Sequence, residues 1–96
     1  MRKLYLVTYD VADPARLRHI YRLMRGYGDH VQLSVFLCEL SPKEKAQLRA
    51  RVEDVLHMRE DQLLLVDLGP AEGRAPGAIQ AIGKRYVHPE HLAIIV

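Results

Sequence analysis

Cysteine is nearly absent from this sequence of 96 residues, and long apolar runs are missing. The single cysteine, Cys38, cannot form an internal disulfide and has no Cys/His ligand spacing around it, so we interpret it as a buried, inert thiol. The short apolar runs, with no basic-then-apolar leader before them, lead us to expect neither a membrane span nor a secretory signal, and hence a cytoplasmic location. Glycine-rich phosphate-binding motifs and zinc-type histidine spacings are also missing.

The composition is that of one folded domain covering residues 1–96. Hydrophobic residues make up 49% of the chain and charged residues 27%, a balance typical of globular proteins rather than disordered chains. The net charge is only +2, but residues 1–25 carry six Lys and Arg against two Asp. Such a basic patch suits a phosphate backbone, although a solvated surface is the commoner outcome for clustered charge.

Hydrophobic periodicity and helix-start signals predict the order of the secondary-structure elements. Asp13-Pro14 begins one helix that we expect to end near Tyr27, and Ser41-Pro42 begins a second helix with a capping box. The apolar segment 30–40 is expected to form either one long bent strand or two short strands broken near Leu33-Ser34, and we favour two. The remaining expected strands span residues 3–11, 62–68 and 78–83, with an apolar tail at 91–96.

This order predicts a ferredoxin-like βαββαβ sandwich of the α+β class, with both helices on one face of the sheet. The first strand is apolar on both of its faces, so we expect both faces to be covered. Two helices cover only one of them. We therefore predict a homodimer in which a second copy covers the other face and the C-terminal strands, residues 78–96, are exchanged between subunits.

Asp10 is the leading candidate for a functional residue, because a carboxylate at the end of an apolar strand needs a cationic partner. Arg16, a metal ion or the opposite subunit are the alternatives for that partner. Asp13 is better explained as a helix cap. A twofold dimer axis would bring two Asp10 side chains together, and Mg²⁺ is held by one or two carboxylates with water and substrate phosphate oxygens.

The ordered set Tyr9-Asp10, Arg16, Gly26-Tyr27-Gly28, Val31 to Phe36 and Glu39-Leu40-Ser41 resembles the Cas2 family of CRISPR-associated proteins. The resemblance covers nearly the whole chain, and Ile79 to Gly83 fits the C-terminal region of that family. It implies a ferredoxin-like homodimer with an exchanged C-terminal strand. In place of the basic residue common at one mid-strand position, this chain has Leu33.

The resemblance implies that Asp10 is both the catalytic residue and the Mg²⁺ ligand of an endonuclease that cleaves RNA or DNA. Its implied cleft neighbours are Tyr9, Arg16, Ser34 and Phe36. It also implies a structural role, in which the dimer bridges the CRISPR integrase and holds protospacer DNA during spacer acquisition. In that setting Arg18, Arg22 and Arg25, which share the polar side of the first helix, are expected to bind the nucleic-acid backbone; a solubilising face is the alternative.

Three functional hypotheses therefore remain at the level of sequence. The first is a Mg²⁺-dependent nuclease, and the second is a non-catalytic adaptor in integration. The third is a small-ligand regulatory module, because ferredoxin-like sandwiches support many functions.

Overall fold

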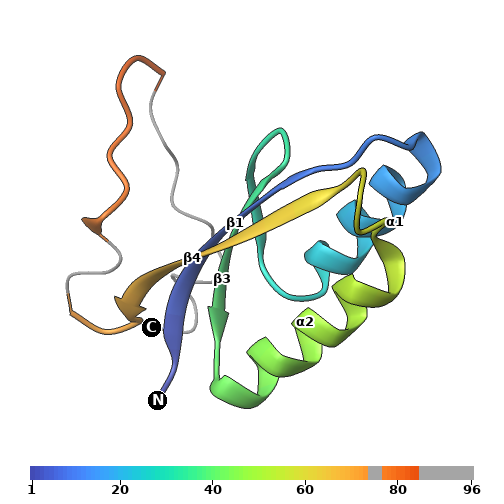
Figure 1. Ribbon diagram of the computed structural model, residues 1–96. Helices are drawn as coiled ribbons and strands as arrows, with labels where there is room; N and C mark the ends of the chain where they lie inside the picture. The colour runs from blue at the N-terminus through green and yellow to red at the C-terminus, as the bar shows by residue number, and fades with distance from the viewer. Residues whose placement is uncertain (74–76, 85–96) are drawn as a thin grey trace.

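Two helices pack against a four-stranded sheet in the computed structural model, which describes residues 1–73 and 77–84 (Figure 1). The elements in chain order are β1 (Lys3–Asp10), α1 (Pro14–Arg25), β2 (Asp29–Gln32), β3 (Val35–Leu40), α2 (Pro42–Val55) and β4 (Gln62–Pro70). Within the described ranges, no helix has the length and apolar character needed to cross a membrane.

The sheet has the strand order β2-β3-β1-β4, and every neighbouring pair is antiparallel. β1 is central: Val7 lies opposite Phe36 of β3 on one side and opposite Leu65 of β4 on the other. This order and connectivity are those of the predicted ferredoxin-like sandwich. The predicted break in segment 30–40 is also confirmed, since β2 and β3 meet at a tight turn where Leu33 has a φ of 31°.

Both helices begin where the capping signals predict. The Asp13 carboxylate accepts a hydrogen bond from the Arg16 backbone N–H at 2.9 Å. At α2, the Glu44 backbone N–H donates to Ser41 Oγ, and the Ser41 backbone N–H donates to the Glu44 carboxylate. α1 ends at Arg25, two residues before the predicted Tyr27, because the Gly26 N–H bonds back to the Leu23 carbonyl in a tighter final turn.

The hydrophobic core lies between the sheet and the two helices. Its fully buried members come from β1, α1, β3 and α2, and include Val7, Ile20, Met24, Phe36 and Leu48. Because side chains alternate along a strand, Tyr5, Val7 and Tyr9 of β1 all point into this core. The intervening residues of β1 lie on the opposite side of the sheet, which we call the open face (Leu4, Leu6, Thr8 and Asp10).

The open face is only partly covered by the chain itself. Leu4 and Leu37 form a small buried cluster, against which Leu68, Ala71 and Ile79 pack. Farther along β4, Leu64 is 47% exposed and Val66 is 42% exposed. The single chain therefore leaves an apolar strip of β4 open to solvent.

The strand predicted at 78–83 is wrong for the single chain, since residues 78–84 form no strand. Ile82 is fully exposed, so no burial stabilises an extended conformation there, and a strand needs a neighbouring edge to bond. The predicted apolar tail at 91–96 lies outside the described residues.

Gly28 connects α1 to β2 at a point where the backbone passes very close to β3. A Cβ at this position would overlap Cys38 Sγ and the Leu37 carbonyl oxygen, whereas a Cβ at Gly26 meets its nearest atom at 3.4 Å. We expect Gly28→Ala to lower the free energy of unfolding by about 1–3 kcal/mol, the cost of overpacking a well-packed site. Gly26→Ala is the matched control, and equal destabilisation by both variants in urea titrations contradicts the expectation.

Candidate functional site

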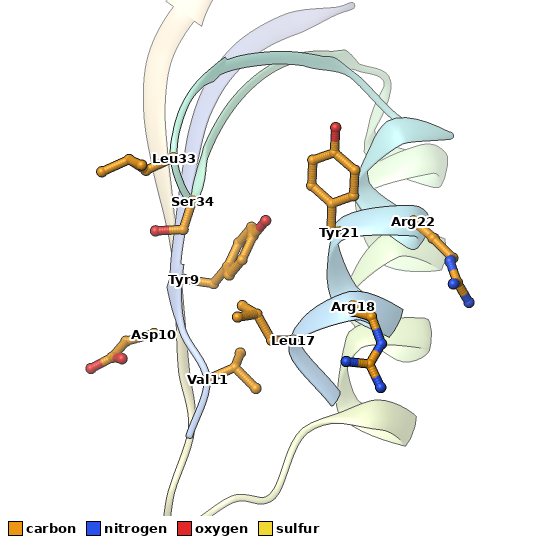
Figure 2. A pocket seen from close by; sticks show the side chains of 9 residues that line it. All are labelled: Tyr9, Asp10, Val11, Leu17, Arg18, Tyr21, Arg22, Leu33 and Ser34. Carbon is orange, nitrogen blue, oxygen red and sulfur yellow. The ribbon is translucent and has the colours of Figure 1, made fainter. Parts of the chain in front are cut away.

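Asp10 ends β1 on the open face and is exposed to solvent. Figure 2 shows its side chain pointing away from α1, whereas the neighbouring Tyr9 points toward the helix. The Ser34 backbone lies beside this strand end, since its carbonyl accepts a hydrogen bond from the Tyr9 N–H at 3.2 Å. The end of β1 thus presents a carboxylate on one side of the sheet and an aromatic ring on the other.

Arg16, the nearest intramolecular candidate to neutralise Asp10, is bound elsewhere. Its Nε donates to Asp61 Oδ2 at 2.7 Å, and one terminal nitrogen donates to Glu60 Oε1 at 3.1 Å. In the part of the chain that the structure describes, the Asp10 carboxylate forms no hydrogen bond or ion pair. The alternative in which Asp10 forms a salt bridge with Arg16 is therefore wrong for the single chain, and the placement of Arg16 as a cleft neighbour stays a prediction.

Asp61 is the residue that sequence reasoning missed. Its side chain has no exposed surface and accepts hydrogen bonds from the Ala12 N–H at 2.9 Å and the His57 N–H at 2.8 Å, besides those from Arg16. The Arg16 hydrogen bond holds the pKa of Asp61 well below its ordinary value. These bonds join the β1–α1 loop, which follows Asp10, to the α2–β4 loop. Because 45 residues separate Arg16 from Asp61, no local pattern signals the pair.

Three aromatic rings form a layer under the end of β1. Tyr9 stacks on Phe36 with ring centroids 6.2 Å apart, and Tyr21 meets Phe36 edge to face at 5.8 Å. Burial raises the pKa of Tyr9 above its ordinary value. Phe36 is fully buried, so it supports the two tyrosines from beneath and does not line a cleft.

A cavity of about 670 Å³ lies between the end of β1 and α1. Figure 2 shows Tyr9, Val11, Leu17 and Tyr21 pointing into the space between strand and helix. The complete lining is Tyr9, Asp10, Val11, Leu17, Arg18, Tyr21, Arg22, Leu33 and Ser34. We call it the tyrosine cavity. It brings together five of the residues predicted for the site, namely Tyr9, Asp10, Ser34, Arg18 and Arg22, and leaves out Arg16, Phe36 and Arg25.

The three predicted nucleic-acid-binding arginines divide into two groups. Arg18 and Arg22 are exposed along the margin of the tyrosine cavity and form no ion pair with any residue that the structure describes. Arg25 lies 5.9 Å from the centre of the Tyr21 ring and lines a second, more polar cavity beside Gly26 and His30. All three keep their positive charge available to an anionic ligand.

Asp10 is a suitable ligand for a hard cation, because it is an exposed carboxylate that no residue of 1–73 or 77–84 neutralises. One chain does not complete such a site: residues 1–73 and 77–84 hold no group of three or more His, Cys, Asp or Glu side chains placed to bind a metal. Mg²⁺ accepts one or two carboxylates when water and substrate phosphates supply the other oxygens. The residues present therefore fit Mg²⁺ only if a second carboxylate or a phosphate joins Asp10.

The fold and this strand-end carboxylate define a small ferredoxin-like protein with a candidate cation-binding site at the sheet rim. Residues 2–73 match the family described as CRISPR associated protein Cas2. The chain belongs to the Cas2 family.

Two relatives and one solved structure illustrate the similarity. The chain is 39% identical to a CRISPR-associated endoribonuclease Cas2 of Rhodospirillum rubrum, over 96% of this chain and 89% of the relative. It is 36% identical to a CRISPR-associated endoribonuclease Cas2 of Geobacter sulfurreducens over the full length of both. The crystal structure of Streptococcus pyogenes Cas2 superposes with a TM-score of 0.72 at 33% identity, covering 83% of this chain and 99% of that one.

The Asp61 hydrogen bonds make the stability of the fold depend on pH. The pKa of Asp61 is lower in the folded chain than the ordinary unfolded value of about 3.9, so its contribution is complete above that value and is lost as the pH falls below it. We expect Asp61→Asn to lower the melting temperature at pH 7, and the gap to wild type to narrow as the pH falls below about 4.

The matched control is Asp54→Asn, an exposed position on α2 without an ion pair among the described residues. It should leave the melting temperature unchanged across the same pH series. A gap between wild type and Asp61→Asn that stays constant from neutral to acid pH contradicts the expectation.

Proposed function

We propose that this protein is a Mg²⁺-dependent endonuclease that works as a homodimer, with Asp10 as its catalytic carboxylate and metal ligand. The observation that carries this proposal is the exposed Asp10 carboxylate on the open face of the sheet, which has no partner among the residues that the structure describes. The names of the two relatives, both endoribonucleases, favour RNA as the substrate. Cleavage then breaks a phosphodiester bond.

The apolar strip on the open face supports the homodimer. Leu64 and Val66 of β4 are nearly half exposed, and β4 is an edge strand whose outer backbone groups lack a strand neighbour in the described chain. A second copy packed on this face would bury both side chains and bring two Asp10 carboxylates toward one axis. The C-terminal residues of each copy would add to the free edge of the other.

Different residues of the chain bind the cation, fix the loop after Asp10 and bind the phosphate backbone. The two Asp10 carboxylates hold the cation and orient it, while the Arg16–Asp61 bond fixes the loop that follows Asp10. When bound, Mg²⁺ would polarise a phosphoryl oxygen and make the attacking water easier to deprotonate. Arg18, Arg22 and Arg25 neutralise the phosphate backbone, since α1 contains no acidic residue.

We also propose the structural role for the same dimer, in which it bridges the CRISPR integrase and holds protospacer DNA during spacer acquisition in the cytoplasm. Two features support an adaptor: the free β4 edge, which can accept a strand from a partner, and the exposed arginines of α1, which suit a backbone without reading its sequence. The small-ligand alternative has no comparable support from family membership.

Asp10→Asn separates cleavage from assembly. The amide removes the negative charge that holds the cation but keeps the size of the side chain, so we expect metal-dependent cleavage to fall about 100-fold or more while the dimer persists. Cleavage of labelled RNA with and without Mg²⁺, beside light scattering for mass, measures both. The Asp54→Asn control should cleave normally, and full activity of Asp10→Asn overturns the proposed catalytic role.

The adaptor role depends on different residues. We expect Asp10→Asn to retain integrase binding and spacer acquisition, whereas deletion of residues 91–96 removes both, because the apolar tail is proposed to add a strand to the partner. Pull-down of the integrase and an acquisition assay in cells test this pair of variants. Loss of acquisition in Asp10→Asn with integrase binding intact would mean that cleavage itself is required.

A further inference from the structure

The tyrosine cavity has apolar walls that the fold leaves open. Leu17 is 40% exposed although it lies on the apolar side of α1, and Tyr21 beside it is only partly buried. Figure 2 shows the Leu17 side chain pointing toward Tyr9, with the Tyr21 ring in the space between α1 and the strand. A volume of about 670 Å³ lies within the range of small-molecule sites.

The rings of the cavity are held in fixed orientations. Phe36 contacts both Tyr9 and Tyr21 from the core, and His30 meets the other edge of Tyr21 with centroids 5.3 Å apart. The Tyr9 hydroxyl forms no hydrogen bond with the described residues, so it can bond a ligand. A preorganised aromatic wall with one available hydroxyl suits a flat, partly polar ring.

The margin of the cavity is positively charged. Arg18 and Arg22 line it, and Figure 2 shows their guanidinium groups turned outward, away from β1. α1 carries four arginines and no acidic residue. The ligand that fits is therefore flat and apolar in the part that enters, and anionic in the part that stays outside.

We propose that the tyrosine cavity binds one unpaired nucleobase of a single-stranded nucleic acid, with Arg18 and Arg22 on the adjoining phosphates. This inference rests on the proposed nuclease function and names the form of its substrate. A base stacks on the Tyr21 ring, and the Tyr9 hydroxyl bonds its edge. Asp10 directly follows Tyr9 at the same strand end but points to the open face, so a strand held by its base on the helix side reaches the carboxylate by passing over this rim of the sheet.

The cavity selects single strands for a geometric reason. In a duplex each base is stacked on both sides and paired along its edge, so entering a lateral cavity costs unstacking and unpairing. An unpaired base enters without that cost. Paired substrates are then held by the arginines alone.

The test uses the full-length Asp10→Asn protein in EDTA, so that binding is measured without cleavage. Two labelled single-stranded RNAs of equal length are compared by fluorescence anisotropy, one with all its bases and one abasic. Both carry the same phosphates. We expect the complete RNA to bind about 10-fold tighter, the effect of stacking one base on an aromatic ring.

Tyr21→Leu should remove this difference and leave the affinity for abasic RNA unchanged. Tyr27→Leu is the matched control, because Tyr27 lies just beyond α1 and does not line the tyrosine cavity. Circular dichroism confirms that both variants fold. Should Tyr21→Leu fail to fold, Leu17→Trp serves instead: it adds the only tryptophan of the chain to the cavity wall, and complete RNA should quench its fluorescence while abasic RNA does not.

Equal affinity of the protein for complete and abasic RNA overturns the proposal. The proposal is also overturned if Tyr21→Leu dissociates the dimer but still binds complete RNA more tightly than abasic RNA. In that case the cavity holds a second copy of the chain and not a base. Failure of the nuclease proposal gives a different result. The protein then still binds complete RNA more tightly than abasic RNA, but protein with Asp10 intact does not cleave RNA in Mg²⁺.

Discussion

The ion pair between Arg16 and Asp61 determines what the candidate site can do. The Asp61 side chain is inaccessible to solvent and accepts hydrogen bonds from two backbone N–H groups as well as from the guanidinium. These bonds hold the β1–α1 loop against the α2–β4 loop. Because Asp61 binds Arg16, that guanidinium does not neutralise Asp10. The carboxylate at the end of β1 is consequently available to a cation from outside the chain, which is the basis of the proposed chemistry.

Because side chains alternate along β1, the proposed base-binding residue Tyr9 and the proposed metal ligand Asp10 lie on opposite sides of the same strand end. Tyr9 points toward α1 and closes the back of the tyrosine cavity, whereas Asp10 points to the open face. A nucleic acid lying over this rim meets an aromatic cavity and arginines on one side and a carboxylate on the other. The proposed base recognition and the proposed cleavage would thus lie next to each other without competing for the same surface.

The open face links the chemistry to assembly. A single carboxylate binds Mg²⁺ weakly, and a partly exposed apolar strip on β4 is a cost for an isolated chain. Packing of a second copy on this face would supply the second carboxylate and bury the apolar strip. The same surface that stabilises the proposed dimer would therefore complete the proposed cation site.

The sequence by itself determined the element order, both helix starts and the ferredoxin-like sandwich, because capping residues and hydrophobic periodicity act over a few neighbouring residues. It also singled out Asp10 as a candidate, since a charge ending an apolar strand is visible locally. Only the tertiary structure decided that Arg16 binds Asp61, that Leu17 faces a cavity rather than the core, and that residues 78–84 form no strand in one chain. These outcomes depend on contacts between distant segments, which no local pattern encodes.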